Sequence, residues 1–358
     1  GDSNVAVGYA ALDVNTTASS NVAIGNAALS ANTTGTTNTA VGYNAMLLNT
    51  TGGYSIAIGG LALDANTTGG SNAAVGYSAL GTNTTGGANT AVGINSMDAN
   101  TTASYNTAVG YDSLGVNTTG AQNVVVGALA LDANTAASNN TAVGYSALGA
   151  NTTAENNTAV GAFALLASTT GANNVAVGSF ALDSNTTGAE NVAVGHGALG
   201  VNTTAGSNVA VGTYSLDANT TGYSNIAIGS HSLGANTTGY LNTAVGYAAL
   251  DASTTAYTNT AFGAYALGAV VVNVNNTATG YNALAANTTY NNTAVGAYCC
   301  DVSTTGANNA VVGQSAMHAH TTGDNNAALG MNALLASTTG AQNVAVGNLA
   351  GQNTTTAA

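Results

Sequence analysis

The sequence predicts an all-β protein, a parallel β-solenoid or β-roll of about 21 coils with about 17 residues in each coil. Three observations predict this fold. One motif recurs at a constant spacing, a β-branched residue occupies a fixed place in it, and a glycine follows that residue in every copy. The composition agrees, because the 358 residues include 47 Gly but no Pro, Lys, Arg or Trp, as is typical of repetitive fibres.

The repeat begins with Asn-x-Ala-Val-Gly, and we number its positions 1 to 17 from that Asn. Its first Asn recurs at Asn4, Asn21 and Asn38, and the same step continues to Asn276. One residue is lost before the copy that starts at Asn292, after which the step resumes. Neither composition nor charge changes along the chain. We therefore expect residues 1–358 to form a single continuous repeat array without separate caps or linkers.

Two large apolar residues recur in each copy. Position 4 is Val or Ile in almost every copy, as in Val7 and Ile24, and position 9 is nearly always Leu or Met, as in Leu12 and Met46. Two such residues per copy are too few for an amphipathic helix. β-Branched residues between turn-forming residues favour two short strands per coil, with the position 4 residue inside the coil and the position 3 Ala, such as Ala6, facing away.

Glycine and asparagine supply the corners of the predicted coil. The position 5 residue is always Gly, as in Gly8, where a chain that leaves a strand must turn with positive φ or pack closely against another backbone. The Asn-Thr-Thr-Gly segment, as at residues 32–35, is expected to form a second corner, because Asn and Gly tolerate left-handed conformations.

Acidic residues at position 10 indicate that successive copies of the repeat are neighbours in space. Carboxylates on adjacent coils would lie about 4.8 Å apart and repel one another, so stacking favours an Asp in alternate coils only. Asp and Gly alternate in this way in two runs, Asp64, Gly81, Asp98, Gly115, Asp132, Gly149 and Asp183, Gly200, Asp217, Gly234, Asp251, Gly268.

The charge of the chain excludes some partners. With 13 acidic residues and no Lys or Arg, the formal charge is −13, so nothing neutralises phosphates or anionic lipid headgroups. We expect no binding to nucleic acid. No apolar run approaches the length that spans a bilayer, so we expect no membrane insertion in this segment.

The small core predicts self-association. Two large side chains per coil bury little apolar area compared with the entropy lost when a whole coil is ordered. We therefore expect additional burial between chains, in a homotrimer, an end-to-end filament, or both.

The Asn-x-Ala-Val/Ile-Gly core, as at residues 21–25, resembles the head repeats of YadA-type trimeric autotransporter adhesins. The longer form Asn-Thr-Ala-Val-Gly-Tyr-x-Ala-Leu-x-x-Asn-Thr-Thr-Gly is similar to repeats of phage and bacterial tail-fibre proteins. Nearly the whole chain shares this resemblance, although the adhesin repeat is usually shorter than the one in this chain. It implies a left-handed homotrimeric rod and an extracellular location on a cell-surface fibre, a filament or a virion fibre.

The Asn-Thr-Thr segments also fit the acceptor pattern for N-glycosylation. The alternative, which we favour, is a turn in which stacked Asn side chains form a ladder. The candidate acceptors are Asn15, Asn32, Asn49, Asn66, Asn83, Asn100, Asn117, Asn151, Asn185, Asn202, Asn219, Asn236, Asn287 and Asn353.

One candidate metal site departs from the repeat. His318 and His320 replace turn residues in one coil, and Asp301 lies one repeat before His318. Imidazole and carboxylate are common metal ligands, but a surface ion pair is the simpler interpretation and the one we favour. We expect no cofactor. The adjacent Cys299 and Cys300 are interpreted as small core residues, since Cys300 stands at the Leu position of the repeat.

Tyrosines that follow the repeat glycine in alternate coils could stack on sugars, although covering the corner is the simpler role. They are Tyr9, Tyr43, Tyr77, Tyr111 and Tyr145.

The sequence therefore predicts an extracellular structural fibre or filament shaft that presents repetitive, adhesin-like surfaces. We expect no enzyme, because no nucleophile and base, phosphate loop or carboxylate pair stands out from the repeat. The alternatives are ligand-binding solenoids, either a glycan-binding adhesin or an ice-binding protein. Against ice binding, the threonines of Asn-Thr-Thr are adjacent in a turn instead of alternating on a flat strand.

Overall fold

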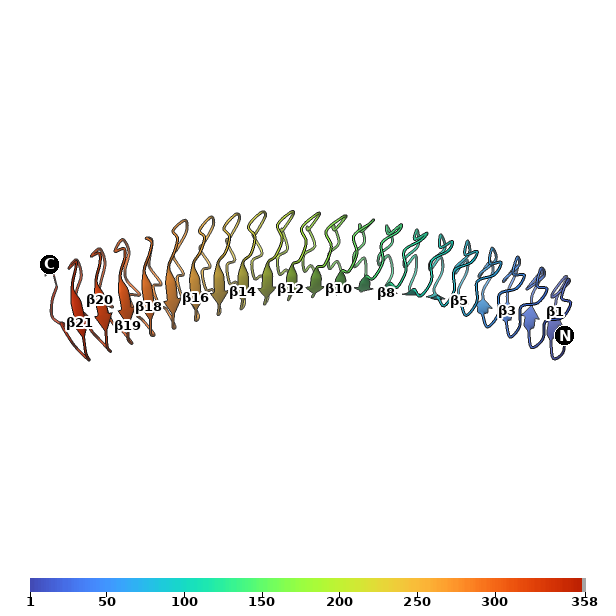
Figure 1. Cartoon of the computed structure of the whole chain (residues 1–358), viewed down its shortest axis with the longest axis horizontal. Helices are drawn as coiled ribbons and strands as arrows, with labels where there is room; N and C mark the ends of the chain where they lie inside the picture. The colour runs from blue at the N-terminus through green and yellow to red at the C-terminus, as the bar shows by residue number, and fades with distance from the viewer. Residues whose placement is uncertain (356–358) are drawn as a thin grey trace. The chain divides into compact units, whose positions relative to one another are not determined.

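The structure is a computed structural model that describes residues 1–355. The chain divides into two compact units, residues 1–179 and residues from 180 onward. In each unit the chain winds in coils that contain one three-residue strand apiece, and residues 1–355 contain no helix (Figure 1). None of the described segments is therefore a helix that could cross a membrane. The predicted fold class, an all-β parallel β-solenoid, is confirmed in both units.

Unit 1 contains eleven strands, one in each coil. They are β1 (Val5–Val7), β2 (Val22–Ile24), β3 (Thr39–Val41), β4 (Ile56–Ile58), β5 (Ala73–Val75), β6 (Thr90–Val92), β7 (Thr107–Val109), β8 (Val124–Val126), β9 (Thr141–Val143), β10 (Thr158–Val160) and β11 (Val175–Val177).

Unit 2 contains ten strands of the same length. They are β12 (Val192–Val194), β13 (Val209–Val211), β14 (Ile226–Ile228), β15 (Thr243–Val245), β16 (Thr260–Phe262), β17 (Thr277–Thr279), β18 (Thr293–Val295), β19 (Ala310–Val312), β20 (Ala327–Leu329) and β21 (Val344–Val346).

Successive strands in each unit pair in parallel, in the register that the repeat predicts. Ala6 lies beside Ala23 in unit 1, and Ala193 lies beside Ala210 in unit 2, each pair one repeat apart. Between β17 and β18 the step is one residue shorter, at the place where the sequence has lost a residue. The prediction that residues one repeat apart are neighbours is confirmed.

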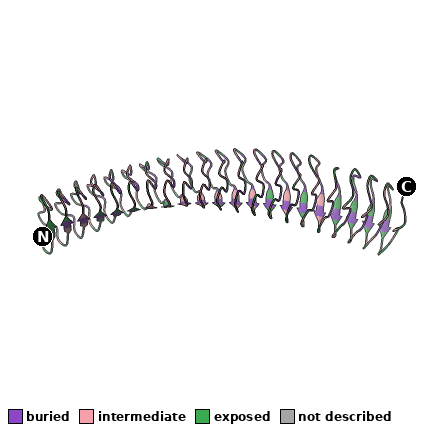
Figure 2. Ribbon diagram, turned by 180° about the vertical axis from the view of Figure 1, so that it is seen from behind, coloured by how far each residue is buried: buried purple, intermediate pink, exposed green. Residues whose placement is uncertain are grey.

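The strand faces are the reverse of the predicted ones. The middle residue of each strand, the position 3 Ala, faces into the coil, as Ala108 does with no exposed surface. Its neighbours Thr107 and Val109 are only half-buried and face outward. Figure 2 shows this as a buried strand centre flanked by exposed or half-buried residues. The prediction that the position 4 Val or Ile fills the coil was wrong, because the inward position of the strand is position 3, which holds Ala in most coils and Val in two, Val125 and Val311.

The second side of the coil is not a strand, which corrects the prediction of two strands per coil. Residues at positions 7 and 9 are left-handed, with φ of 52° at Ala27 and 55° at Leu29, values that no extended strand adopts. Backbone hydrogen bonds still join the coils on this side, since the Leu29 amide donates to the Ala45 carbonyl oxygen at 3.0 Å. The position 9 side chain, as in Leu29 and Met46, is fully buried as predicted.

The position 5 glycine has both of the predicted features, a positive φ and close packing against the backbone of another coil. Gly25 has φ of +134°, and a Cβ atom there would lie 2.3 Å from the Gly42 carbonyl oxygen of the next coil. The stacking of the next coil on this corner therefore requires glycine at residue 25.

Two buried asparagine ladders complete the core. At position 12 the Asn49 side chain donates to Asn32 Oδ1 at 2.9 Å and to the Gly52 carbonyl oxygen at 3.0 Å. At position 1 the backbone N–H of Asn38 donates to Asn21 Oδ1 at 2.9 Å. The Asn-Thr-Thr-Gly corner therefore depends on the side-chain hydrogen bonds of its Asn. The left-handed residue near this corner is at position 17, as in Thr37 with φ of 60°.

Candidate functional site

The outward residues of the strands form the first candidate surface, which we call the outer strand face. It consists of positions 2 and 4 of every coil, and Ile58, Val126 and Ile228 on it are 42%, 39% and 40% exposed. Soluble monomers rarely leave so many adjacent apolar side chains in contact with water. Within each unit the outer strand face is therefore a surface suited to association.

Threonine shares this face with valine. Thr107 and Val109 lie on the same side of β7, and the next strands in register repeat a Thr or Val in front of a Val. Threonines are therefore not confined to the turns, because strand threonines also face outward.

A continuous series of exposed aromatic rings crosses unit 2, and we call it the aromatic row. Successive rings come from positions 6 and 7 of successive coils, with centroids 5.3 to 6.3 Å apart and mostly edge to face. The row contains Phe180, His196, Tyr214, His231, Tyr247, Tyr265, Tyr281 and Tyr298.

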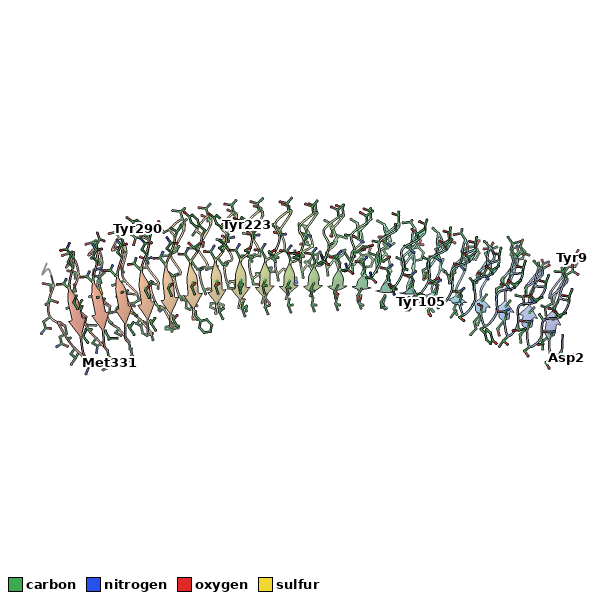
Figure 3. The ribbon with its side chains drawn as sticks, in the orientation of Figure 1. Asp2, Tyr9, Tyr105, Tyr223, Tyr290 and Met331 are labelled. Carbon is green, nitrogen blue, oxygen red and sulfur yellow. The ribbon has the colours of Figure 1, made fainter. Side chains whose placement is uncertain are left out.

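The aromatic row was not predicted from the sequence, because its members alternate between two repeat positions and three residue types. The predicted tyrosines of unit 1 are exposed, from 80% at Tyr9 to 49% at Tyr145, where Tyr145 packs edge to face on Phe163 with centroids 5.3 Å apart. A second, shorter stack lies in unit 2, where the Tyr240 ring is parallel to the rings of Tyr223 and Tyr257, with centroids 5.0 and 4.9 Å away. Figure 3 labels Tyr223, the first ring of this stack.

The position 10 carboxylates stand beside the glycines of neighbouring coils. A Cβ atom at Gly81 would lie 2.6 Å from Asp98 Oδ1 and 3.6 Å from Asp64 Oδ1. Burial raises the pKa of both carboxyl groups, and for Asp64 the charge of Asp98 raises it further. Gly81 therefore separates the carboxylates of Asp64 and Asp98. An Asp in its place would put a third carboxylate between these two.

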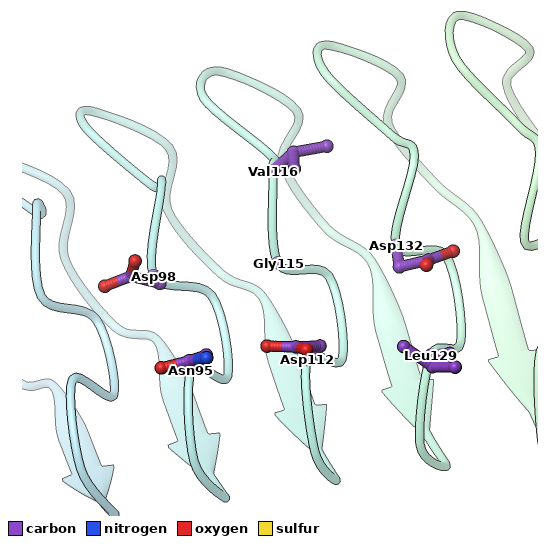
Figure 4. Close-up of a pocket in the computed structure, with 7 residues that line it drawn as sticks. All are labelled: Asn95, Asp98, Asp112, Gly115, Val116, Leu129 and Asp132. Atoms are coloured by element: carbon purple, nitrogen blue, oxygen red, sulfur yellow. The ribbon is translucent and has the colours of Figure 1, made fainter.

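One hollow of about 330 Å³ in unit 1 lies along this column (Figure 4). Asp98 and Asp132 stand on alternate coils with Gly115 between them, while Asn95, Asp112 and Leu129 follow one another at position 7. The charge of Asp112 raises the pKa of Asp98 and of Asp132, after the larger effect of burial. None of the residues that line this hollow is aromatic.

The candidate glycosylation residues are mostly inaccessible in the folded chain. Asn15 is half-buried and Asn353 is exposed, whereas the other twelve have no exposed surface. The Nδ2 atom that would carry a glycan donates hydrogen bonds instead, as Asn66 Nδ2 does to Asn49 Oδ1 at 2.7 Å. Attachment at such a position would have to precede folding, and it remains a prediction.

The candidate metal ligands are only partly brought together. His318 Nδ1 contacts Asp301 Oδ1 in a partly exposed pair, where His and Asp occupy position 10 of successive coils. His320 is buried and its Nε2 lies 2.7 Å from the Gly323 carbonyl oxygen. Burial lowers the pKa of His320. Within residues 1–355 no group of three His, Cys, Asp or Glu side chains is placed to hold a metal ion.

The two cysteines are buried free thiols, as the repeat predicts. Contact with the Cys299 thiol, with burial as the second cause, raises the pKa of Cys300 well above its ordinary value. A thiol held in its neutral form is a poor nucleophile and a poor ligand, so Cys300 is suited to the role of a small core side chain.

No protein-family model matches this chain, and no curated sequence matches it.

Proposed function

We propose that this chain is part of an extracellular structural fibre in which copies of the chain associate through the outer strand face. The observation that carries the proposal is the exposure of Val, Ile and Thr on the outward side of successive strands in each unit. Association would remove this apolar surface from water and add to the small core of each coil.

Three copies are proposed from the resemblance to trimeric adhesin heads, and the extracellular location rests on the same resemblance. The proposal assigns the chain no catalytic role. Its function is to extend and to present repeated surfaces, in a homotrimer that can also stack end to end.

Sedimentation equilibrium tests the association. Three copies of the 34.2 kDa chain are expected at neutral pH and moderate salt. Val92→Asp combined with Val109→Asp places two charges on the outer strand face and should yield monomers. Thr102→Asp with Thr119→Asp adds the same charge to the same two coils at exposed turn positions and should leave the trimer intact. A monomeric parent, or equal behaviour of the two double variants, would contradict the proposal.

Ice binding is the second candidate, and the specific observation that favours it is the outward Thr and Val of strands such as β6 and β7. Flat parallel strands repeat these side chains at about 4.8 Å. The same face cannot be buried in a trimer and also bind ice. Thermal hysteresis of a monomeric parent would support ice binding, and a trimer without hysteresis would support the fibre.

A further inference from the structure

A hollow of about 200 Å³ lies beside the aromatic row in unit 2 and combines rings with carboxylates. Phe180 and Asp183 line it from one coil, and Tyr214 and Asp217 line it from the second coil along. The coil between them has glycine at both facing positions, Gly197 and Gly200, and these two residues make the space.

The side chains of the flanking coils reach over the glycines. A Cβ atom at Gly197 would lie 2.8 Å from two ring carbons of Tyr214, and one at Gly200 would lie 3.5 Å from Asp183 Oδ1. The Tyr214 ring therefore lies over one glycine of the middle coil, and a carboxylate oxygen of Asp183 lies near the other. The His196 ring nitrogen Nε2 lies 3.1 Å from the Tyr214 hydroxyl, a hydrogen bond that fixes the ring covering Gly197.

We propose that this hollow binds a small organic cation of the quaternary ammonium class. Aromatic faces attract such a cation through their quadrupole, and the two carboxylates supply the opposite charge. The chain has no Lys or Arg, so no second copy can fill the hollow with a side chain of fixed positive charge, and we assign the hollow to a small cation from solution. The volume of about 200 Å³ suits a trimethylammonium group.

The state of the carboxylates agrees with this assignment. Burial raises the pKa of Asp183 and of Asp217, and backbone hydrogen bonds offset only part of that effect for each. The charge of His231 also lowers the pKa of Asp217, but the chain has no Lys or Arg that would offset the remaining effect of burial. A bound cation would provide this missing charge.

Choline is the probe, because its methyl protons move upfield when they lie over aromatic rings. Titration of the intact chain with choline chloride, followed by proton NMR, should give a saturable upfield shift. Tyr214→Leu should weaken choline binding about fivefold, and Asp183→Asn with Asp217→Asn should weaken it by a similar factor while leaving the rings in place. These side chains are at least partly exposed, so the variants should melt like the parent.

Three comparisons make the test specific. Asp98→Asn with Asp132→Asn changes the ring-free hollow of unit 1 and should not alter choline binding. The neutral isostere 3,3-dimethylbutan-1-ol has the shape of choline without its charge and should not bind. Phosphocholine, with its added negative charge, should bind more weakly than choline.

The proposal is overturned if the neutral isostere binds as well as choline, since the hollow would then be a general apolar site. It is equally overturned if choline gives no saturable shift, or if Tyr214→Leu binds choline as tightly as the parent. Binding of a neutral oligosaccharide in place of choline would assign the hollow to sugars instead.

Discussion

Alanine is the inward residue of the strands because the two walls of the coil are close together. The hydroxyl of Ser96, on the wall opposite the strands, donates to the Ala108 carbonyl oxygen of the next coil at 3.1 Å. Both residues are fully buried. A side chain at position 3 therefore meets the opposite wall within the length of one small residue.

Substitutions on β7 should separate the two strand faces. Ala108→Asp buries a charge without a partner and should lower the free energy of unfolding by about 3 kcal/mol. Thr107→Asp and Val109→Asp face outward and should each cost well under half of that in the monomer. Urea unfolding of monomeric protein measures all three.

The matched control is Ala108→Val, because valine already occupies this position at Val125 and Val311 with no exposed surface. It should cost less than about 1.5 kcal/mol. Equal losses for Ala108→Asp and Val109→Asp would mean that the faces are not distinct.

Interruptions of the position 12 ladder leave buried polar atoms without partners. Where Ser253 replaces Asn, its own Oγ and the Oδ1 of Asn236 in the coil before both lack a hydrogen bond. Each such atom loses its hydrogen bonds to water on folding and gains no hydrogen bond within the protein.

Ser253→Asn should restore the missing rung and raise the free energy of unfolding by about 1 kcal/mol. Ser253→Ala removes the unpaired hydroxyl but leaves Asn236 Oδ1 as it is, so it should stabilise the chain less. Thermal unfolding of the two variants and the parent gives the order. If the Ala variant is the more stable, the ladder hydrogen bonds contribute little.

At the scale of the coil, the period, the register and the invariant glycine could be predicted from the sequence, because each depends on residue identity at a fixed spacing. The face assignment failed because alternation identifies two faces without saying which is inside. Hydrophobicity favoured Val109, but the width of the coil favoured Ala108. The left-handed residues at positions 7 and 9 leave no sequence signal, since Leu29 is a residue type that rarely adopts positive φ.

The candidate sites were less predictable than the coil. Asp301 and His318 meet because they share position 10, so the repeat alone placed them together. His320 stands two residues later and lies in the buried position 12 ladder instead. The hollow in unit 2 depends on Gly197 and Gly200 in one coil and on rings from its neighbours, a combination that no single repeat position reveals.

The carboxylate column should respond to an added charge in a salt-dependent way. Gly81→Asp puts a third carboxylate between those of Asp64 and Asp98 and should destabilise the chain most at low salt and neutral pH. At about 1 M salt the Debye length falls to roughly 3 Å, and much of the lost stability should return. Thermal unfolding across a salt series measures this.

Gly81→Asn is the matched control, since it has nearly the same shape without the charge. It should show the steric cost alone, with little dependence on salt. If the Asp and Asn variants melt together at low salt, repulsion along the column is not the reason for the Asp and Gly alternation.

The position 10 carboxylates and His320 should make the free energy of unfolding depend on pH in opposite directions. Burial raises the pKa of Asp64 above 3.8, so the folded state binds its proton more tightly and the free energy of unfolding rises as pH falls toward that value. Burial lowers the pKa of His320 below 6.5, so the unfolded state binds its proton more tightly and stability is lost as pH falls from about there.

His320→Asn introduces the residue that the ladder usually has and should remove the second effect. The parent should lose stability relative to this variant as pH falls from 7 toward 5, and the difference should be constant above pH 7. Chemical unfolding at several pH values measures the difference, which also cancels the carboxyl groups common to both proteins. A difference that does not change with pH would mean that His320 stays solvated.

For the whole molecule, a charge of −13 without a single Lys or Arg opposes the association of copies. Charges on neighbouring chains repel, whereas burial of the outer strand face attracts. Salt screens the repulsion between the chains and strengthens the burial of the outer strand face, so assembly should increase with salt concentration. Sedimentation equilibrium across a salt series measures this, and assembly that weakens as salt is added would contradict it.

Limited proteolysis should identify the coil of unit 2 that opens most readily. Trypsin has no cleavage site, so a protease of broad specificity is needed. Limited digestion should cut first at the ends or near residues 269–276, where Val271 and Val272 replace the usual threonines and are exposed. Mass spectrometry of the first fragments checks this. Early cuts throughout residues 1–355 would contradict a structure in which the coils protect one another.

The alternation of Asp and Gly also constrains how such a gene can change in length. Every coil meets its neighbours through the same ladders, so unequal recombination could insert or remove whole copies without disturbing the backbone. Within the alternating runs, however, loss of a Gly copy or gain of an Asp copy would bring two Asp residues onto adjacent coils, whereas gain or loss of an adjacent pair of copies keeps the alternation. Heritable length changes in these runs should therefore exclude those two single-copy events and favour changes by pairs of copies.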